Sequence, residues 1–248
     1  MLLILPPSET KRDGGAEGYP LDLSALSYPS LTPQRSAALK ALATLSRNQR
    51  VATGALSLGP TQRHELARNR AVATSAVMPA IERYTGVLYD GLDAATLTAE
   101  QRAFAASHVV IHSALFGLLG ADDPVPAYRL SHNSRLPGLP LGRHWRSAVS
   151  AELAAHDGLL IDARSEAYAS LGPAPRRENS IYLRVVSEGE SGRRVALSHF
   201  NKKAKGLFAR AMVSAGLVHP NVDSLLRWAD TAGVTLEPGA EGELDLVV

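Results

Sequence analysis

The densest concentration of positive charge lies in residues 193–210, which hold six basic residues and no acidic one. Residues 211–248, by contrast, hold one basic and six acidic residues. On a helix, four of the basic side chains project from the side opposite an apolar stripe: Lys202, Lys203, Lys205 and Arg210. Lysines in a first helical turn oppose the helix dipole, and a bound anion would explain their placement. The pattern predicts a phosphate-binding surface, with a lysine-rich solvent face as the alternative.

Two short apolar segments each lead into a polar pair. The first precedes Ser8 and Glu9, and the second precedes Ser165 and Glu166. Open α/β sheets bind ligands at the carboxyl ends of their strands, so the two pairs could converge in one cleft. These four residues are the candidate catalytic residues of an enzyme, and that function requires a buried Glu9 or Glu166 with a shifted pKa.

A hydrophobic–Gly–hydrophobic pattern runs from Leu115 to Asp123. Such a turn between two apolar segments is typical of a helix–hairpin–helix element, whose glycines let main-chain N–H groups reach a DNA phosphate. Gly117 and Gly120 would make these contacts, and Arg129 would add positive charge nearby. A tight turn between buried elements is the alternative.

No cysteine occurs in the chain, which excludes disulfides, Cys-ligated zinc or iron–sulfur sites, and a thiolate nucleophile. His108 and His112 are four residues apart, but no third ligand follows at a meaningful spacing, so a structural role is favoured. The sequence also lacks a P-loop, a nucleophile elbow and a dinucleotide fingerprint. We therefore expect no metal site and no cofactor.

Strands and helices alternate along the chain. Short strands are expected at residues 2–5, 109–111 (or a buried helix start), 159–161, 181–187 and 195–198, with a terminal hairpin at 234–237 and 244–248. Helices are expected at residues 32–47 with Thr32 as N-cap, 78–84, 98–107 behind a Thr98–Gln101 capping box, and 142–156. Residues 89–92 indicate a turn. The mixture implies an α+β or mixed α/β architecture in one compact domain over residues 1–248.

The composition is that of a soluble globular protein. The 248 residues are 45% hydrophobic and 20% charged, with a formal net charge of +2. The first five residues lack the basic start of an export signal, and the longest weakly polar run, 108–121, is too short to cross a bilayer. We expect a cytoplasmic protein with no membrane contact.

Six motifs then occur in order along nearly the whole length: residues 5–9 (LPPSE), 89–92 (YDGL), 113–119 (SALFGLL), 128–130 (YRL), 164–168 (RSEAY) and 201–206 (NKKAKG). Through these motifs and their order, the chain resembles the YaaA family of bacterial peroxide-stress proteins. The resemblance implies a mixed α/β "cantaloupe" fold with a helix–hairpin–helix element and a positively charged cleft. It also implies binding to double-stranded, especially distorted, DNA, and protection from hydroxyl-radical damage by keeping unincorporated iron low.

The sequence departs from the enterobacterial members of this family in its opening segment. Glu9 stands near the position of their lysine, and Lys11 follows two residues later, which makes Lys11 a further candidate for phosphate binding. The leading hypothesis is a non-enzymatic DNA-binding protein whose cations neutralise phosphates. Four such contacts would give a log–log salt slope near −4. The alternative is an enzyme acting on a phosphorylated or nucleotide-like small molecule in the same cleft.

Overall fold

A mostly parallel sheet forms the centre of the molecule. The structure is a computed structural model that describes residues 1–188, 194–196 and 200–248. The described residues contain an eight-stranded sheet in the order β4-β3-β1-β6-β7-β10-β9, with β8 paired to β7. The parallel strands are β3 (Val109–Ser113), β1 (Leu2–Leu5), β6 (Leu160–Asp162), β7 (Ser180–Glu188) and β10 (Glu243–Val247).

Antiparallel strands complete the sheet. They are β4 (Gly117–Gly120) beside β3, β8 (Arg194–Ala196) beside β7, and β9 (Leu236–Pro238) beside β10. A separate two-stranded ladder joins β2 (Met78–Pro79) to β5 (Pro124–Val125). The fold is therefore mixed α/β, as the sequence predicted.

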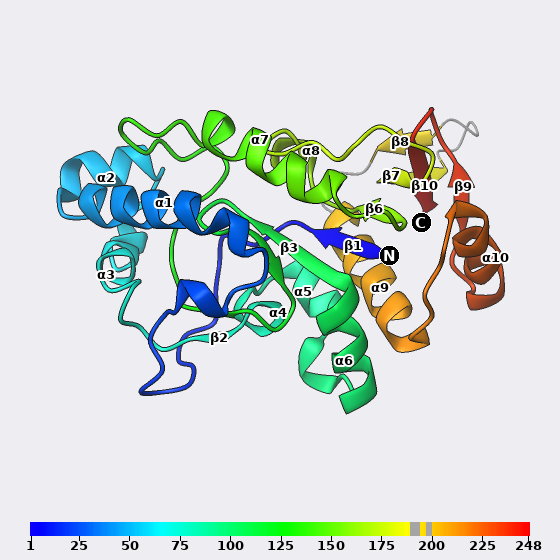
Figure 1. The fold of residues 1–248 in the computed structure, drawn as a ribbon, viewed down its shortest axis with the longest axis horizontal. Helices are drawn as coiled ribbons and strands as arrows, with labels where there is room; N and C mark the ends of the chain where they lie inside the picture. The colour runs from blue at the N-terminus through cyan, green and yellow to red at the C-terminus, as the bar shows by residue number, and fades with distance from the viewer. Residues whose placement is uncertain (189–193, 197–199) are drawn as a thin grey trace.

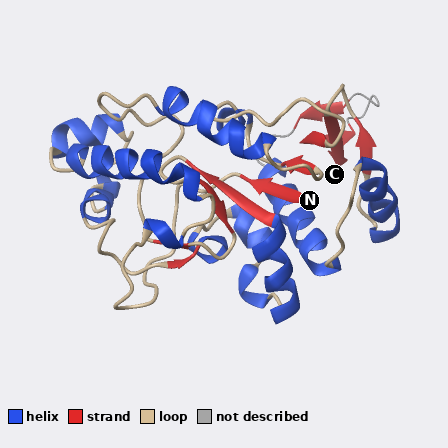
Figure 2. Cartoon of the chain, viewed as in Figure 1, coloured by secondary structure: helices blue, strands red, loops and turns tan. Residues whose placement is uncertain are grey.

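Helices cover both faces of the sheet (Figures 1 and 2). In this view α7 (Leu141–Ala154) and α8 (Glu166–Ala169) lie above it, and α5 (Val87–Leu92), α6 (Ala99–His108) and α9 (Phe200–Ala215) lie below. At the left end are α1 (Thr32–Leu45), α2 (Gln49–Ala55) and α3 (Glu65–Arg70); α4 is Ala80–Arg83, and α10 (Val222–Ala232) lies at the right end. Among the described residues, no helix is both long enough and apolar enough to cross a lipid bilayer.

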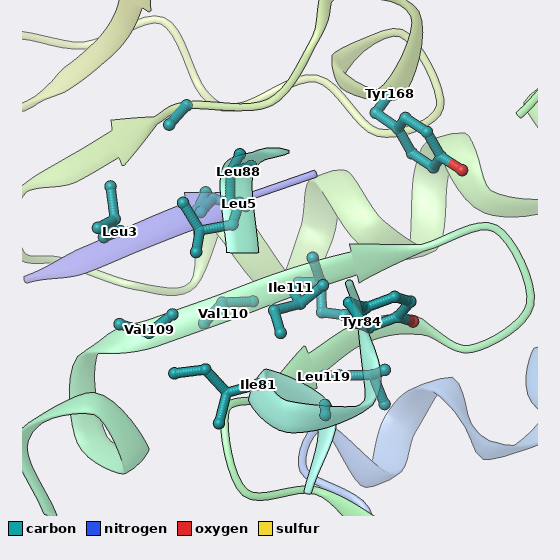
Figure 3. Packing of buried hydrophobic residues seen from close by; sticks show 14 of the residues in the cluster. Leu3, Leu5, Ile81, Tyr84, Leu88, Val109, Val110, Ile111, Leu119 and Tyr168 are labelled. Atoms are coloured by element: carbon teal, nitrogen blue, oxygen red, sulfur yellow. The ribbon is translucent and has the colours of Figure 1, made fainter. Parts of the chain in front are cut away.

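The core lies between the central strands and these helices. Leu3 and Leu5 of β1 are in register with Val109 and Ile111 of β3, and all of these side chains belong to the buried cluster (Figure 3). All four side chains are at most 3% exposed. Apolar strands buried on both faces are typical of parallel sheets covered by helices. This explains why β1 and β3 are short continuous apolar runs and show no alternation.

Several expected elements are confirmed. The strand over residues 2–5 is β1, and the segment at 109–111 is a strand. The Thr98–Gln101 capping box forms, with both hydrogen bonds present at 3.0 and 3.3 Å. The strands β7 and β8 pair antiparallel, although residues 197–198 of the strand expected at 195–198 lie outside the described residues. The terminal hairpin forms as β9–β10.

Other expectations were wrong. Thr32 is the first helical residue of α1 and not its N-cap, which is Leu31. Residues 89–92 form most of α5, where we expected a turn. The expected helix at 78–84 is divided into β2 and the short α4. The turn signal in the YDGL segment is Gly91, and this glycine lies against the backbone of α9.

Candidate functional site

The strands that follow β1 and β6 in the chain lie on opposite sides of this pair in the sheet. After β1 it continues to β3 on one side, whereas after β6 it continues to β7 on the other side. Because β1 and β6 are parallel neighbours, their carboxyl ends meet at the same edge, and the diverging loops leave a crevice between them. Such a switch point is where open α/β sheets bind ligands.

A cleft of about 790 Å³ occupies this position. Its walls come from the loops after β1 and β6, the segment leading into α5, the start of α9 and β7. The polar and charged lining residues include Ser8, Glu9, Ser131, His132, Ser165, Glu166, Tyr168, Tyr182, Asn201, Lys202 and Lys205. The two polar pairs singled out in the sequence therefore line one cleft.

Ser8 and Glu9 are held by specific partners. The Thr85 N–H donates to Ser8 Oγ at 3.1 Å, which ties this loop to the segment before α5. Arg129 Nη2 donates to Glu9 Oε2 at 2.6 Å; the arginine is buried, whereas the Glu9 side chain is 57% exposed. Arg129 thus neutralises Glu9 at the mouth of the cleft, so it does not present a free cation to DNA.

Ser165 and Glu166 lie at the start of α8. The Ser165 side chain accepts a hydrogen bond from the Tyr168 N–H at 3.4 Å and caps the helix. Glu166, like Glu9, is exposed. The enzyme hypothesis requires one of these two carboxyls to be buried with a shifted pKa, and the structure leaves both carboxylates at the surface.

Lys11 is buried beneath the same loop. Its ammonium group donates to the carbonyl oxygens of Ser8 at 3.0 Å and Glu9 at 3.2 Å, and it lies 4.1 Å from the centre of the Tyr128 ring. Burial lowers the pKa of Lys11 to about 7. In this position Lys11 holds the Ser8–Glu9 loop in place and does not reach the surface.

The lysines of α9 separate into two kinds. Lys202 and Lys203 are exposed in the first turn, and Lys202 lines the cleft. Lys205 is only 4% exposed, at the floor of the cleft. Its ammonium group donates to the Arg164 carbonyl oxygen at 3.1 Å. The expectation that Lys205 projects into solvent was therefore wrong, because α9 packs on the sheet over more of its circumference than the apolar stripe indicates.

Arg210 lies at the other end of α9. Its Nη1 donates to the Asp93 carbonyl oxygen and to Thr96 Oγ1, both at 2.8 Å. Arg210 thus joins α9 to the segment after α5, so its guanidinium is engaged within the chain.

The helix–hairpin–helix element is not confirmed. Residues 109–113 and 117–120 form the antiparallel strands β3 and β4, joined by a turn, and both Gly117 and Gly120 are buried. The Gly120 N–H donates to the Asp123 carboxylate at 2.9 Å. Gly117 has φ +67°, and a Cβ there would lie 2.7 Å from the Trp145 ring. The glycines therefore serve a tight turn and close packing, and neither lies in the cleft.

A buried ion pair that the sequence patterns did not predict lies beneath the cleft. Arg164 donates to the Asp162 carboxylate through Nε at 2.8 Å and Nη2 at 2.6 Å. Its Nη1 donates to His112 Nδ1 at 2.7 Å. Burial, followed by the charge of Arg164, lowers the pKa of His112 well below its usual value. A clear signal was present, since two opposite charges end the apolar strand β6.

Two aromatic residues of the cleft were also missed as site residues. Tyr182 projects from β7, and its hydroxyl donates to the Arg164 carbonyl oxygen at 3.0 Å. Tyr168 projects from α8 and packs edge-on against His132, with ring centres 5.2 Å apart. Within residues 1–188, 194–196 and 200–248, no group of three or more His, Cys, Asp or Glu side chains could hold a metal ion.

The protein is a mixed α/β protein with a mostly parallel sheet covered by helices. It has a polar cleft at the switch point of the sheet, where proteins of this class bind ligands. The chain belongs to the family described as "Peroxide stress protein YaaA", whose match covers residues 1–237.

Curated relatives match over most or all of the chain. A UPF0246 protein of Corynebacterium glutamicum is 42% identical over 255 aligned positions, which cover all of both chains. A UPF0246 protein of Streptomyces coelicolor is 40% identical over 87% of this chain and 84% of its own. A UPF0246 protein of Bordetella pertussis is 27% identical, with 98% of its length covered.

Proposed function

We propose that this peroxide-stress protein binds double-stranded, and preferentially distorted, DNA through the surface at the mouth of the cleft. The observation that carries the proposal is the pair of exposed lysines, Lys202 and Lys203, in the first turn of α9. Two cations at the positive end of a helix dipole are unfavourable without an anion nearby. A nucleic-acid backbone supplies such anions in a regular array.

Contacts of this kind hold the backbone without reading the bases. Specificity would then come from the shape and deformability of the DNA, so that bulges and junctions bind more tightly than a regular duplex. DNA would then be protected from damage by unincorporated iron as an indirect consequence of binding. Most of the other predicted cations do not contribute, because Lys11 is buried and Arg129 and Arg210 are engaged within the chain.

The test is fluorescence anisotropy of labelled duplex, bulged and four-way-junction DNA at several salt concentrations. Reversing both charges, Lys202→Glu with Lys203→Glu, removes two phosphate contacts. We expect at least tenfold weaker binding near 50 mM salt, and a log–log salt slope that is less steep by about 2.

The matched control reverses two exposed cations at the other end of the molecule, Lys40→Glu in α1 with Arg50→Glu in α2 (Figure 1). It makes the same change in net charge and should retain most of the affinity and the slope. Equal binding by the wild type and the α9 variant, or an equal loss in the two variants, would remove this surface assignment.

The second candidate function is an enzyme acting on a phosphorylated or nucleotide-like small molecule. The specific observation in its favour is the cleft at the switch point between β1 and β6. Against it, the two carboxylates proposed for acid–base chemistry are exposed, and Ser165 serves as a helix cap. Turnover of a nucleotide by the purified protein would favour this function.

A further inference from the structure

We infer that the floor of the cleft is a subsite for a single nucleotide, with its phosphate on Lys205 and its base against the aromatic wall. The chemical class is a nucleoside monophosphate unit, either unpaired and extruded from DNA or free in solution. Binding of a nucleotide extruded from DNA rests on the proposed function, whereas binding of a free nucleotide does not.

The size of the cleft excludes a duplex from its floor. A volume of about 790 Å³ lies within the range of sites for single small molecules. Lys205 lines that floor and is 4% exposed, so a phosphate on the outer surface of a regular helix does not reach its ammonium group. Lys202 at the mouth is exposed and is therefore accessible to such a phosphate. The two lysines therefore serve different ligands or different parts of one ligand.

The surroundings of Lys205 form an anion site. The ammonium group carries three N–H bonds, and among the described residues it has one hydrogen-bond acceptor, the Arg164 carbonyl oxygen at 3.1 Å. It also lies 5.3 Å from the centre of the Tyr182 ring. The remaining N–H bonds are available to the oxygens of a phosphate.

The charges near Lys205 leave its own charge only partly compensated. Burial lowers its pKa to about 8, against the opposing effects of Asp162 and Glu166. Asp162 is already paired with Arg164, and Glu166 is exposed to solvent, which screens its charge. Tyr182 faces the lysine from β7, and burial raises its pKa to about 12, so it stays neutral. An anion in the cleft would supply the missing countercharge.

The aromatic residues that line the cleft suit a base. Tyr168 and His132 line the cleft with their rings in contact, and Tyr89 lines it from α5, with its hydroxyl donating to the Pro6 carbonyl oxygen at 2.8 Å. Apolar surface is added by Pro6 and Leu88. Aromatic side chains bind the faces of unpaired bases with little sequence preference. Enzymes that extrude bases use pockets of this composition.

The first experiment compares a labelled duplex with the same duplex carrying one bulged thymidine, for the wild type, Lys205→Met and Lys203→Met. We expect Lys205→Met to abolish the preference for the bulge, a loss of at least tenfold, while duplex affinity changes less than twofold. Lys203→Met, the matched control, should weaken both DNAs equally and keep the preference. Methionine is of similar length and apolar, and thermal melting reports whether each variant is folded.

A competition experiment needs no variant. Excess thymidine 5′-monophosphate should remove the bulge preference of the wild type without displacing the duplex. The preference should also fall as the pH rises from 7 to 9.5. Lys205 must be protonated to hold the phosphate. Without a ligand its pKa is about 8, so above pH 8 the protein must take up a proton when the nucleotide binds. The limiting effect is tenfold per pH unit, and Lys205→Met should show no such dependence.

The outcomes separate this inference from the proposed function. If DNA binds, and neither Lys205→Met nor thymidine 5′-monophosphate alters the bulge preference, the nucleotide subsite is overturned and the DNA-binding surface stands. If no DNA binds, but calorimetry detects thymidine 5′-monophosphate with the wild type and not with Lys205→Met, the subsite stands for free nucleotides. Failure of both ligands overturns both.

Discussion

Replacing Arg164 by methionine is expected to lower the free energy of unfolding by about 3–5 kcal/mol, the cost of leaving a buried charge without its partner. Arg164 is fully buried, and it is the bidentate partner of the Asp162 carboxylate. For a chain of this length the loss corresponds to a fall in the melting temperature of about 6–20 °C. Thermal and urea unfolding followed by circular dichroism measure it.

An exposed arginine–carboxylate pair provides the control. Arg184 donates to Glu243 at 2.9 Å with 41% of its side chain exposed. Surface pairs of this kind contribute less than about 1 kcal/mol. Glu243→Gln should therefore melt close to the wild type, and it leaves Arg184 in place 4.0 Å from the buried Asp245 carboxylate. Adding Asp162→Asn to Arg164→Met should recover part of the loss, since no unpaired charge then remains. Equal melting of the two single variants would contradict the structural role given to Arg164.

Replacing Gly206 by alanine is expected to cost about 3 kcal/mol, at the upper end of ordinary overpacking. A Cβ at this position would lie 2.9 Å from the Leu88 carbonyl carbon and 3.2 Å from the Gly91 Cα. Both neighbours are backbone atoms of α5, so the two helices must move apart as bodies. The melting temperature should fall by about 6–12 °C.

Gly142 in α7 is the matched control for this substitution. It is also a helical glycine, but a Cβ there meets nothing within 4 Å. Gly142→Ala should leave the protein unchanged or raise its stability by about 0.5–1 kcal/mol, because alanine favours the helix. A Gly206→Ala variant as stable as Gly142→Ala would show that α5 and α9 do not approach as closely as described.

Local patterns predicted the elements whose signals are local. The apolar run of β1, the capping box at Thr98 and the terminal hairpin are each defined by adjacent residues. The α5 helix was mistaken for a turn because Gly91 is a turn signal in isolation. Its actual role, close contact with Gly206, depends on a residue more than a hundred positions away.

The candidate site shows the same division. Polar residues after two buried strands were sufficient to predict that Ser8 and Glu166 could share a cleft, and both line it. The depth of each side chain could not be predicted in this way. The helical pattern assigned Lys205 to the solvent side together with Lys203, because periodicity does not reveal how far the neighbouring strand and loops extend around a helix. Lys203 and Lys205 belong to one helix, but they differ in burial and therefore in the ligands that they can reach.

Photo-crosslinking can show which surface of the protein receives DNA. Duplex DNA with a bulged 5-iodo-2′-deoxyuridine would be irradiated with the wild-type protein, and the modified peptide would be located by mass spectrometry. We expect an adduct on the cleft wall, at Tyr168, Tyr182 or His132. We also expect thymidine 5′-monophosphate to suppress this adduct. A dominant adduct on the α1–α2 end or on α10, unaffected by the nucleotide, would contradict the claim that the cleft receives DNA.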